Sequence, residues 1–84
     1  MTMIYKICPA KIWQQAEKVN FFYGSGIDFA DGYIHFSTAR QVAETAHLHF
    51  ANQTDLVLVE VDSTAIKIVW EESSVGELFP HLYD

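Results

Sequence analysis

Asp31-Gly32-Tyr33-Ile34-His35-Phe36-Ser37-Thr38 is the stretch of the sequence that decides the fold. It predicts a tight turn at Asp31-Gly32, then a short strand, then a helix cap at Thr38. Alternation along the strand puts Tyr33, His35 and Ser37 on one face and Ile34 and Phe36 on the other. A strand with an apolar back and a Tyr, His and Ser front is typical of the wall of a polar pocket.

The composition describes one small folded domain over residues 1–84. Half of the residues are apolar and 14% are aromatic, which excludes a disordered polar chain. Eleven acidic residues against five scattered basic ones give a net charge of −6, so no basic stripe is available for nucleic acid. The longest apolar run, Leu56–Val59, is too short to span a membrane, and the N-terminus does not read as a signal peptide. With a single cysteine, these features favour the cytoplasm; they predict no oligomeric state.

The segment before the deciding stretch predicts a strand, a helix and a loop. Ile4–Ile7 is rich in β-branched and aromatic residues, as strands are. Apolar residues at helical spacing from Ile12 to Val19 predict a helix that ends near Asn20, with Pro9 at its start. The segment 21–30 reads as a loop, because of its glycines, with a heavy aromatic load that anchors it to the core or folds it over a site.

The segment after the deciding stretch predicts a helix and two strands. Thr38 and Gln41 fit a capping box, and an apolar stripe extends the helix to about Ala51. Leu56–Val61 predicts a strand covered on both faces, and Ile66–Trp70 predicts a second, alternating strand. Pro80 prevents a regular helix in the tail. The chain is therefore an α+β domain with a small split sheet, mixed or antiparallel, and two helices.

Among the titratable groups, four are candidates for chemistry. His35 and His81 lie between apolar neighbours, where an imidazole needs a partner: structural roles and ligand contact both remain open. Glu71 alternates with Trp70 at the end of a strand, where a carboxylate suits stabilisation of a cation-like transition state. Cys8 at a helix start is a weaker nucleophile candidate. His47 and His49 point to different sides of a helix, so no metal site is predicted.

Spaced blocks along the whole chain resemble the small bacterial family named domain of unknown function 952. They include the deciding stretch and, at intervals around it, Tyr5-Lys6-Ile7, Tyr23-Gly24-Ser25, Trp70-Glu71 and Phe79-Pro80-His81-Leu82-Tyr83. The resemblance implies a fold similar to that of ADP-ribosyltransferases, whose split sheet grips NAD. In active branches of that superfamily a strand carries His-x-Ser, which His35-Phe36-Ser37 matches.

The resemblance further implies NAD as a possible ligand and a role for each of several residues. His35 would contact a ribose, Ser37 would help to hold the nicotinamide end, and Glu71 would be the catalytic glutamate. The stacking aromatic would be Tyr23, Tyr33 or Tyr83. Members of the family usually continue beyond Phe79–Tyr83, so a shortened member or a fragment without the C-terminal strands is expected.

Three functions are consistent with these residues. The first, which the sequence favours, is binding of a small nucleotide-like ligand in a pocket formed by Tyr33, His35, Ser37, Glu71 and His81. The second is an enzyme acting on the N-glycosidic bond of NAD, with Glu71 and His35 as catalytic residues. The third is a non-catalytic interaction protein in which His35 and His81 satisfy buried polar groups and both tryptophans lie in the core.

Overall fold

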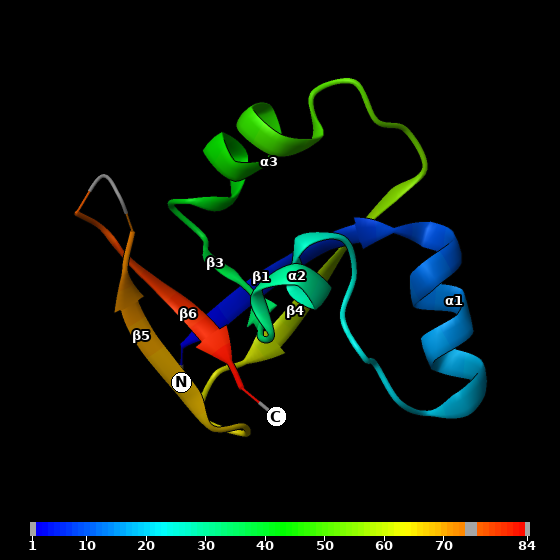
Figure 1. The fold of residues 1–84 in the computed structure, drawn as a ribbon, viewed down its shortest axis with the longest axis horizontal. Coiled ribbons are helices and arrows are strands. Elements are labelled where there is room, and N and C mark those ends of the chain that lie inside the picture. Colours follow the sequence, from blue (N-terminus) through cyan, green and yellow to red (C-terminus); the bar gives the residue numbers. More distant parts are fainter. Residues whose placement is uncertain (1, 74–75, 84) are drawn as a thin grey trace.

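A computed structural model describes residues 2–73 and 76–83 (Figure 1). Its elements follow one another in the order β1 (Met3–Pro9), α1 (Ala10–Val19), α2 (Ile27–Asp31), β2 (Ile34–His35), β3 (Ser37–Thr38), α3 (Val42–Phe50), β4 (Leu56–Asp62), β5 (Ile68–Glu72) and β6 (Leu78–Leu82). The α+β class is confirmed, with three helices in the described residues in place of the predicted two.

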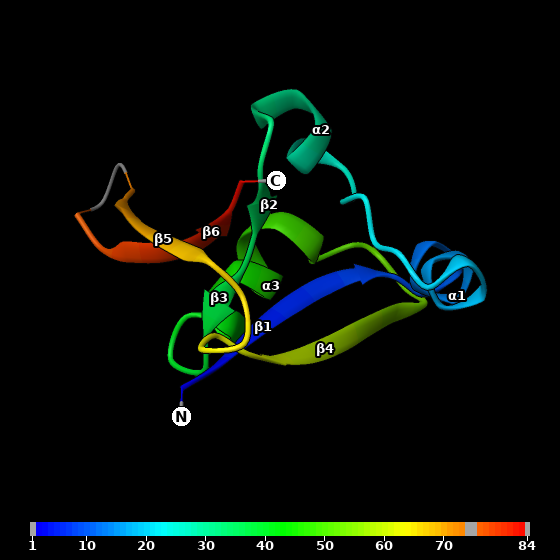
Figure 2. The same ribbon diagram turned by 90° about the horizontal axis from the view of Figure 1, so that it is seen from below.

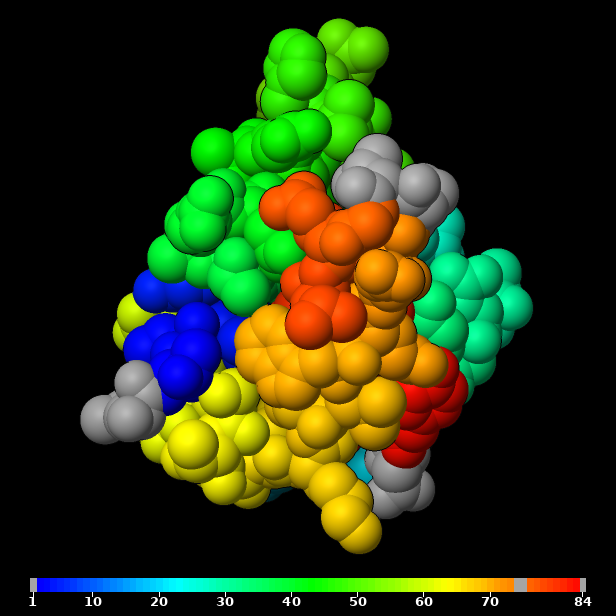
Figure 3. Space-filling model, turned by 90° about the vertical axis from the view of Figure 1, so that its left-hand side faces the viewer, coloured from blue at the N-terminus to red at the C-terminus, as the bar shows by residue number. Residues whose placement is uncertain are grey.

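The strands form two separate three-stranded sheets. The first has the order β3-β1-β4 and the second the order β2-β6-β5. Every pairing is antiparallel, which resolves the predicted mixed or antiparallel sheet in favour of the latter. The two sheets diverge from each other in Figure 2, with α2 beyond one end of β2. Figure 3 shows the face formed by β5 and β6, with the segment of α3 beside it.

The predicted strand Tyr33–Ser37 is broken, because its two halves belong to different sheets. Ile34 and His35 pair with β6, whereas Ser37 and Thr38 pair with β1. Between them, Phe36 is 7% exposed, and its N–H donates to the carbonyl oxygen of Pro80 at 3.0 Å. A single buried residue therefore carries the chain from one sheet to the other.

The core lies against one face of β1. Alternation places Ile4, Lys6 and Cys8 on this face, and all three are buried, Ile4 and Cys8 completely. Phe36, Ala16 of α1 and the fully buried Pro80 of β6 complete this small core. A lysine in the middle of such a face requires a buried partner.

Two of the three described helices, α1 and α3, lie where the apolar periodicity of the sequence predicts them, and α2 does not. Helix α1 ends where expected, with Asn20 in the left-handed conformation at φ 59°. The reciprocal bonds predicted for a capping box are present: the Gln41 N–H donates to Thr38 Oγ1 at 3.3 Å, and the Thr38 N–H donates to Gln41 Oε1 at 3.0 Å. The predicted N-cap at Thr38 is wrong, because these bonds close the turn before α3, whose N-cap is Gln41. The prediction of a loop over 21–30 is wrong at its end, because α2 begins at Ile27.

Two predictions of burial are wrong. Strand β4 is not covered on both faces: Leu58 is 58% exposed, and β4 lies at the edge of its sheet. Trp70 does not belong to the core, since it is 41% exposed on β5. Both sequence patterns were hydrophobic enough for burial, but the small domain does not have a second layer to cover them.

Candidate functional site

The site is organised by Asp28, the most deeply buried acid of α2. This short helix begins after Gly26, whose φ of 54° favours glycine, and the Gly32 N–H closes it on the carbonyl oxygen of Asp28 at 2.9 Å. Asp28 is 3% exposed, and its Oδ2 lies 2.7 Å from Lys6 Nζ. Backbone N–H groups of Ser25 and His35 donate to the same carboxylate at 2.9 and 3.1 Å.

These bonds determine the charge of Asp28. Burial alone would raise the pKa of its carboxyl, but the bonds from Lys6, the Ser25 N–H and His35 outweigh burial and lower the pKa below its ordinary value. Asp28 and Lys6 are therefore a buried ion pair that joins α2 to β1.

His35 is held between two carboxylates. Its Nδ1 lies 2.6 Å from Asp28 Oδ1, and its Nε2 lies 2.9 Å from Asp31 Oδ2. Carboxylates only accept hydrogen bonds, so the ring donates to both when it is protonated. Both nitrogens are thus occupied, and His35 presents its ring face and edge, rather than a vacant nitrogen, to its surroundings.

A second cluster surrounds His81 on β6. Its Nδ1 lies 2.7 Å from Glu71 Oε1, and the Tyr83 hydroxyl donates to the same oxygen at 2.6 Å. The hydrogen bond from Tyr83, then that from His81, lowers the pKa of Glu71, which favours the ionised carboxylate. In turn, the bond to Glu71 raises the pKa of Tyr83 to about 12.

Tyr33 connects the two clusters through its ring. Its centroid lies 4.5 Å from that of His35, 4.3 Å from His81 and 4.9 Å from Tyr83. His35 and His81 are cross-strand partners in the register of β2 and β6. The structure therefore brings together five of the residues singled out from sequence, namely Tyr33, His35, Glu71, His81 and Tyr83.

A cavity of about 600 Å³ lies beside this cluster, lined by residues of β1, α2, β2, β3, α3, β5 and β6. Tyr33, His35, Ser37 and His81 belong to its lining. Ser37 is 4% exposed, and its hydroxyl donates to Thr45 Oγ1 at 3.1 Å. Within the described residues, Glu71 and Tyr83 are not part of the lining and instead bond to residues near it.

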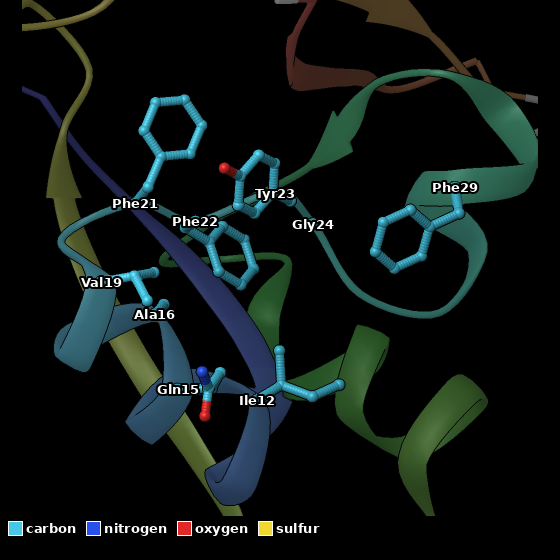
Figure 4. A pocket seen from close by; sticks show the side chains of 9 residues that line it. All are labelled: Ile12, Gln15, Ala16, Val19, Phe21, Phe22, Tyr23, Gly24 and Phe29. Atoms are coloured by element: carbon cyan, nitrogen blue, oxygen red, sulfur yellow. The ribbon is translucent and has the colours of Figure 1, made fainter.

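Tyr23 lies elsewhere. Figure 4 shows it with Phe21, Phe22 and Phe29 around a different, largely apolar cleft of about 380 Å³ beside α1. Its ring contacts Phe21 at 4.6 Å between centroids, and the residue is 72% exposed. The structure thus does not join Tyr23 to the cluster around His35.

Cys8 does not have the surroundings of a nucleophile. It lies in β1 directly before Pro9, the N-cap of α1, as predicted, but it is fully buried, and burial raises the pKa of its thiol. Among residues 2–73 and 76–83, no three His, Cys, Asp or Glu side chains gather closely enough to hold a metal ion. No helix in that part of the chain is long and apolar enough to cross a membrane.

Sequence reasoning missed Lys6, Asp28 and Asp31 as parts of the site. A signal for Lys6 existed, since it shares a strand face with Ile4 and Cys8, and a charge among buried neighbours needs an opposite charge. No local pattern identified Asp28 as that partner, because α2 was read as a loop.

The fold and the site together define a small α+β domain with a polar and aromatic cavity beside two antiparallel sheets. The chain belongs to the family described as "Protein of unknown function (DUF952)", which matches residues 7–84. The crystal structure of protein CC0527 from Caulobacter crescentus is similar, with 43% identity and a TM-score of 0.93 over 98% of this chain and 74% of that one. The solution NMR structure of CC0527 has 44% identity and a TM-score of 0.81 over 99% and 73%. No curated protein matches the sequence.

Proposed function

We propose that this domain binds a small nucleotide-like ligand in the cavity beside His35 and Ser37. The observation that supports the proposal is the convergence of Tyr33, His35, Ser37 and His81, from three strands and their flanks, on one cavity of about 600 Å³. Small-molecule sites have this size and combine aromatic walls with a few fixed polar groups. The Lys6–Asp28–His35 network keeps one wall rigid before any ligand arrives. The proposed compartment is the cytoplasm.

The test is titration of the labelled protein with NAD, ADP-ribose and mononucleotides, followed by NMR. Saturable shifts are expected at His35, Ser37 and Thr45, which line the cavity, and not at Trp13, which lies outside the lining and packs against Phe22. The absence of any saturable shift up to millimolar ligand would contradict the proposal.

A pair of variants on α3 places the ligand in the cavity. Thr45→Phe introduces a ring into the lining, whereas Ala43→Phe adds the same ring at an exposed position of the helix outside it. Thr45→Phe is expected to abolish binding and Ala43→Phe to preserve it. Equal effects would show that the ligand binds elsewhere.

An enzyme acting on the N-glycosidic bond of NAD is the second candidate. It is favoured by His35 and Ser37 on one cavity wall, at the His-x-Ser spacing that the sequence shares with ADP-ribosyltransferases, and by Glu71 bonded to the lining residue His81. Glu71 would then stabilise positive charge that develops on the ribose. NAD turnover that survives both Glu71→Gln and His35→Ala would exclude these catalytic roles.

The third candidate is a non-catalytic interaction protein. It is favoured by the exposed aromatic residues of the apolar cleft, where Phe21, Tyr23 and Phe29 are 57%, 72% and 66% exposed (Figure 4). In that case His35→Ala would cost on the order of 1–3 kcal/mol of stability by orphaning its partners and would change the affinity for no nucleotide. Measuring unfolding and ligand affinity on this one variant separates the third candidate from the first.

A further inference from the structure

The orientation of His81 defines which atom of the cavity lining can bind a ligand. Its Nδ1 faces the Glu71 carboxylate at 2.7 Å, and a carboxylate can only accept, so Nδ1 carries a proton. In the neutral ring Nε2 is then the acceptor. Tyr83, bonded to the same oxygen, and Tyr33, whose ring centroid lies 4.3 Å away, fix the carboxylate and the imidazole.

Nε2 of His81 is also accessible. None of the described residues bonds to it, while every fully buried side-chain nitrogen or oxygen in the described chain has a partner. Nε2 is therefore not fully buried, and it belongs to a side chain that is 12% exposed and lines the cavity. By contrast, both ring nitrogens of His35 are occupied by Asp28 and Asp31.

The charges of the cavity oppose a phosphate. The lining contains four acidic side chains and two basic ones, namely Asp28, Glu44, Glu72 and Glu77 against Lys6 and Arg40. Lys6 is neutralised by Asp28, with which it forms the buried ion pair. Arg40 is thus the one lining cation outside that pair, and it is outnumbered by three carboxylates in the described lining. A cleft lined by one sign of charge repels ligands of the same sign.

We infer that the cavity recognises the uncharged, hydroxyl-bearing part of a nucleoside, with a ligand hydroxyl donating to Nε2 of His81 and Glu71 acting as the positioning residue. This inference rests on the proposed function and refines its ligand class. Phosphates weaken binding, because they approach Glu44, Glu72 and Glu77.

Titrations with adenosine, AMP and ADP-ribose at one low ionic strength test the ligand class. Adenosine is expected to bind most tightly, with AMP roughly threefold to tenfold weaker from repulsion between like charges a few ångströms apart in a partly solvated site. Tighter binding of AMP or ADP-ribose would overturn the inference and leave the proposed function standing. Absence of binding by all three would overturn both.

Two neighbouring variants test the role of Glu71. Glu71→Gln and Glu72→Gln each remove one negative charge from adjacent positions of β5, but Glu71 alone bonds to His81. Glu71→Gln is expected to weaken adenosine binding about tenfold, whereas Glu72→Gln is expected to act mainly on AMP and to bring its affinity closer to that of adenosine. Equal effects of the two variants on adenosine would refute the positioning role.

The ¹⁵N shifts of the His81 ring give a readout that a structural role would not move. In the neutral ring of free wild-type protein, Nδ1 is expected to be protonated and Nε2 unprotonated, and adenosine should shift the Nε2 resonance toward the hydrogen-bonded range. In Glu71→Gln the preference for the Nδ1-protonated tautomer should weaken, because the amide oxygen is a poorer acceptor and the amide NH2 can donate to Nδ1 instead. An Nε2 resonance that adenosine leaves in place, while other cavity residues respond, would overturn the contact.

Discussion

Replacing Asp28 by Asn tests whether the buried ion pair holds the domain together. The amide keeps the size of the side chain, but it cannot neutralise Lys6 Nζ, now 2.7 Å away. Its one oxygen also replaces only one of the two acceptors, because the Ser25 N–H bonds to Oδ2 of Asp28 and the His35 N–H bonds to Oδ1. The lysine side chain is 8% exposed, so its charge stays buried and unpaired. Removing one partner of a buried pair costs about 3–5 kcal/mol.

That loss is large compared with the stability of so short a chain. At about 0.05–0.15 kcal/mol per residue, a domain of this length is stable by about 4–12 kcal/mol. Asp28→Asn is therefore expected to bring the protein close to unfolding at neutral pH. Urea denaturation followed by circular dichroism measures the change, as the shift of the midpoint multiplied by the slope.

Two controls make the result specific. Asp31→Asn removes a carboxylate of the same helix that bonds to His35 but is 46% exposed, and it should cost about 0–1 kcal/mol. In the double variant Lys6→Met, Asp28→Asn, no charge is left unpaired, so its loss should be well below the sum of the two single losses. An Asp28→Asn loss below about 1 kcal/mol, or additive losses in the double variant, would refute the account of the ion pair.

Three more outcomes follow from the same contacts. The pKa of Asp28 is lowered in the folded state, so the ionised carboxylate stabilises the fold above its ordinary pKa of 3.8. That stabilisation is lost as the pH falls through the lowered pKa. Urea midpoints measured against pH should show this loss in the wild type and not in Asp28→Asn. Tyr83 should ionise at about 12, and Glu71→Gln should return it toward 10.0, as followed by the ¹³Cζ shift; an unchanged value would contradict the hydrogen bond. Thr38→Ala should cost about 0.5–1.5 kcal/mol, because it removes the bond from the Gln41 N–H to Thr38 Oγ1. Thr54→Ala, at an exposed position, should change the unfolding midpoint little, and equal losses would contradict a stabilising role for that bond.

The features predicted correctly from sequence are those that short-range patterns determine. Helix α1 follows from apolar residues at helical spacing, and its end follows from the break after Val19. The reciprocal bonds of Thr38 and Gln41 need only these two residues, three positions apart, although they precede α3 and do not cap it. Such features depend on neighbours in the chain, so one sequence is sufficient to find them.

The features that sequence reasoning missed depend on partners distant in the chain. Alternation treated Tyr33–Ser37 as one strand, but the Phe36 N–H bonds to Pro80 and the strand divides there. The partnership of Lys6 with Asp28 likewise depends on how α2 packs against β1. No spacing within either segment encodes these contacts.

The candidate site shows both cases. Contact between Tyr33 and His35 follows from their separation by two positions in a strand, and their rings lie 4.5 Å apart. Glu71 and His81 were each singled out alone, but their hydrogen bond depends on the register between β5 and β6. Sequence reasoning therefore identified these residues of the site, but not the bonds that join Glu71 to His81.

The passage of the chain through Phe36 has a mechanical consequence. It is the shortest covalent link between the two sheets, and His35 and Ser37, on either side of it, both line the cavity. Rotation of one sheet against the other must therefore be absorbed by the backbone torsions of this residue, whose buried ring resists such rotation. Phe36 is thus expected to act as a stiff hinge between the sheets. Because it also belongs to the lining, a smaller side chain there would both remove a ring from the cavity wall and let the gap between the sheets fluctuate.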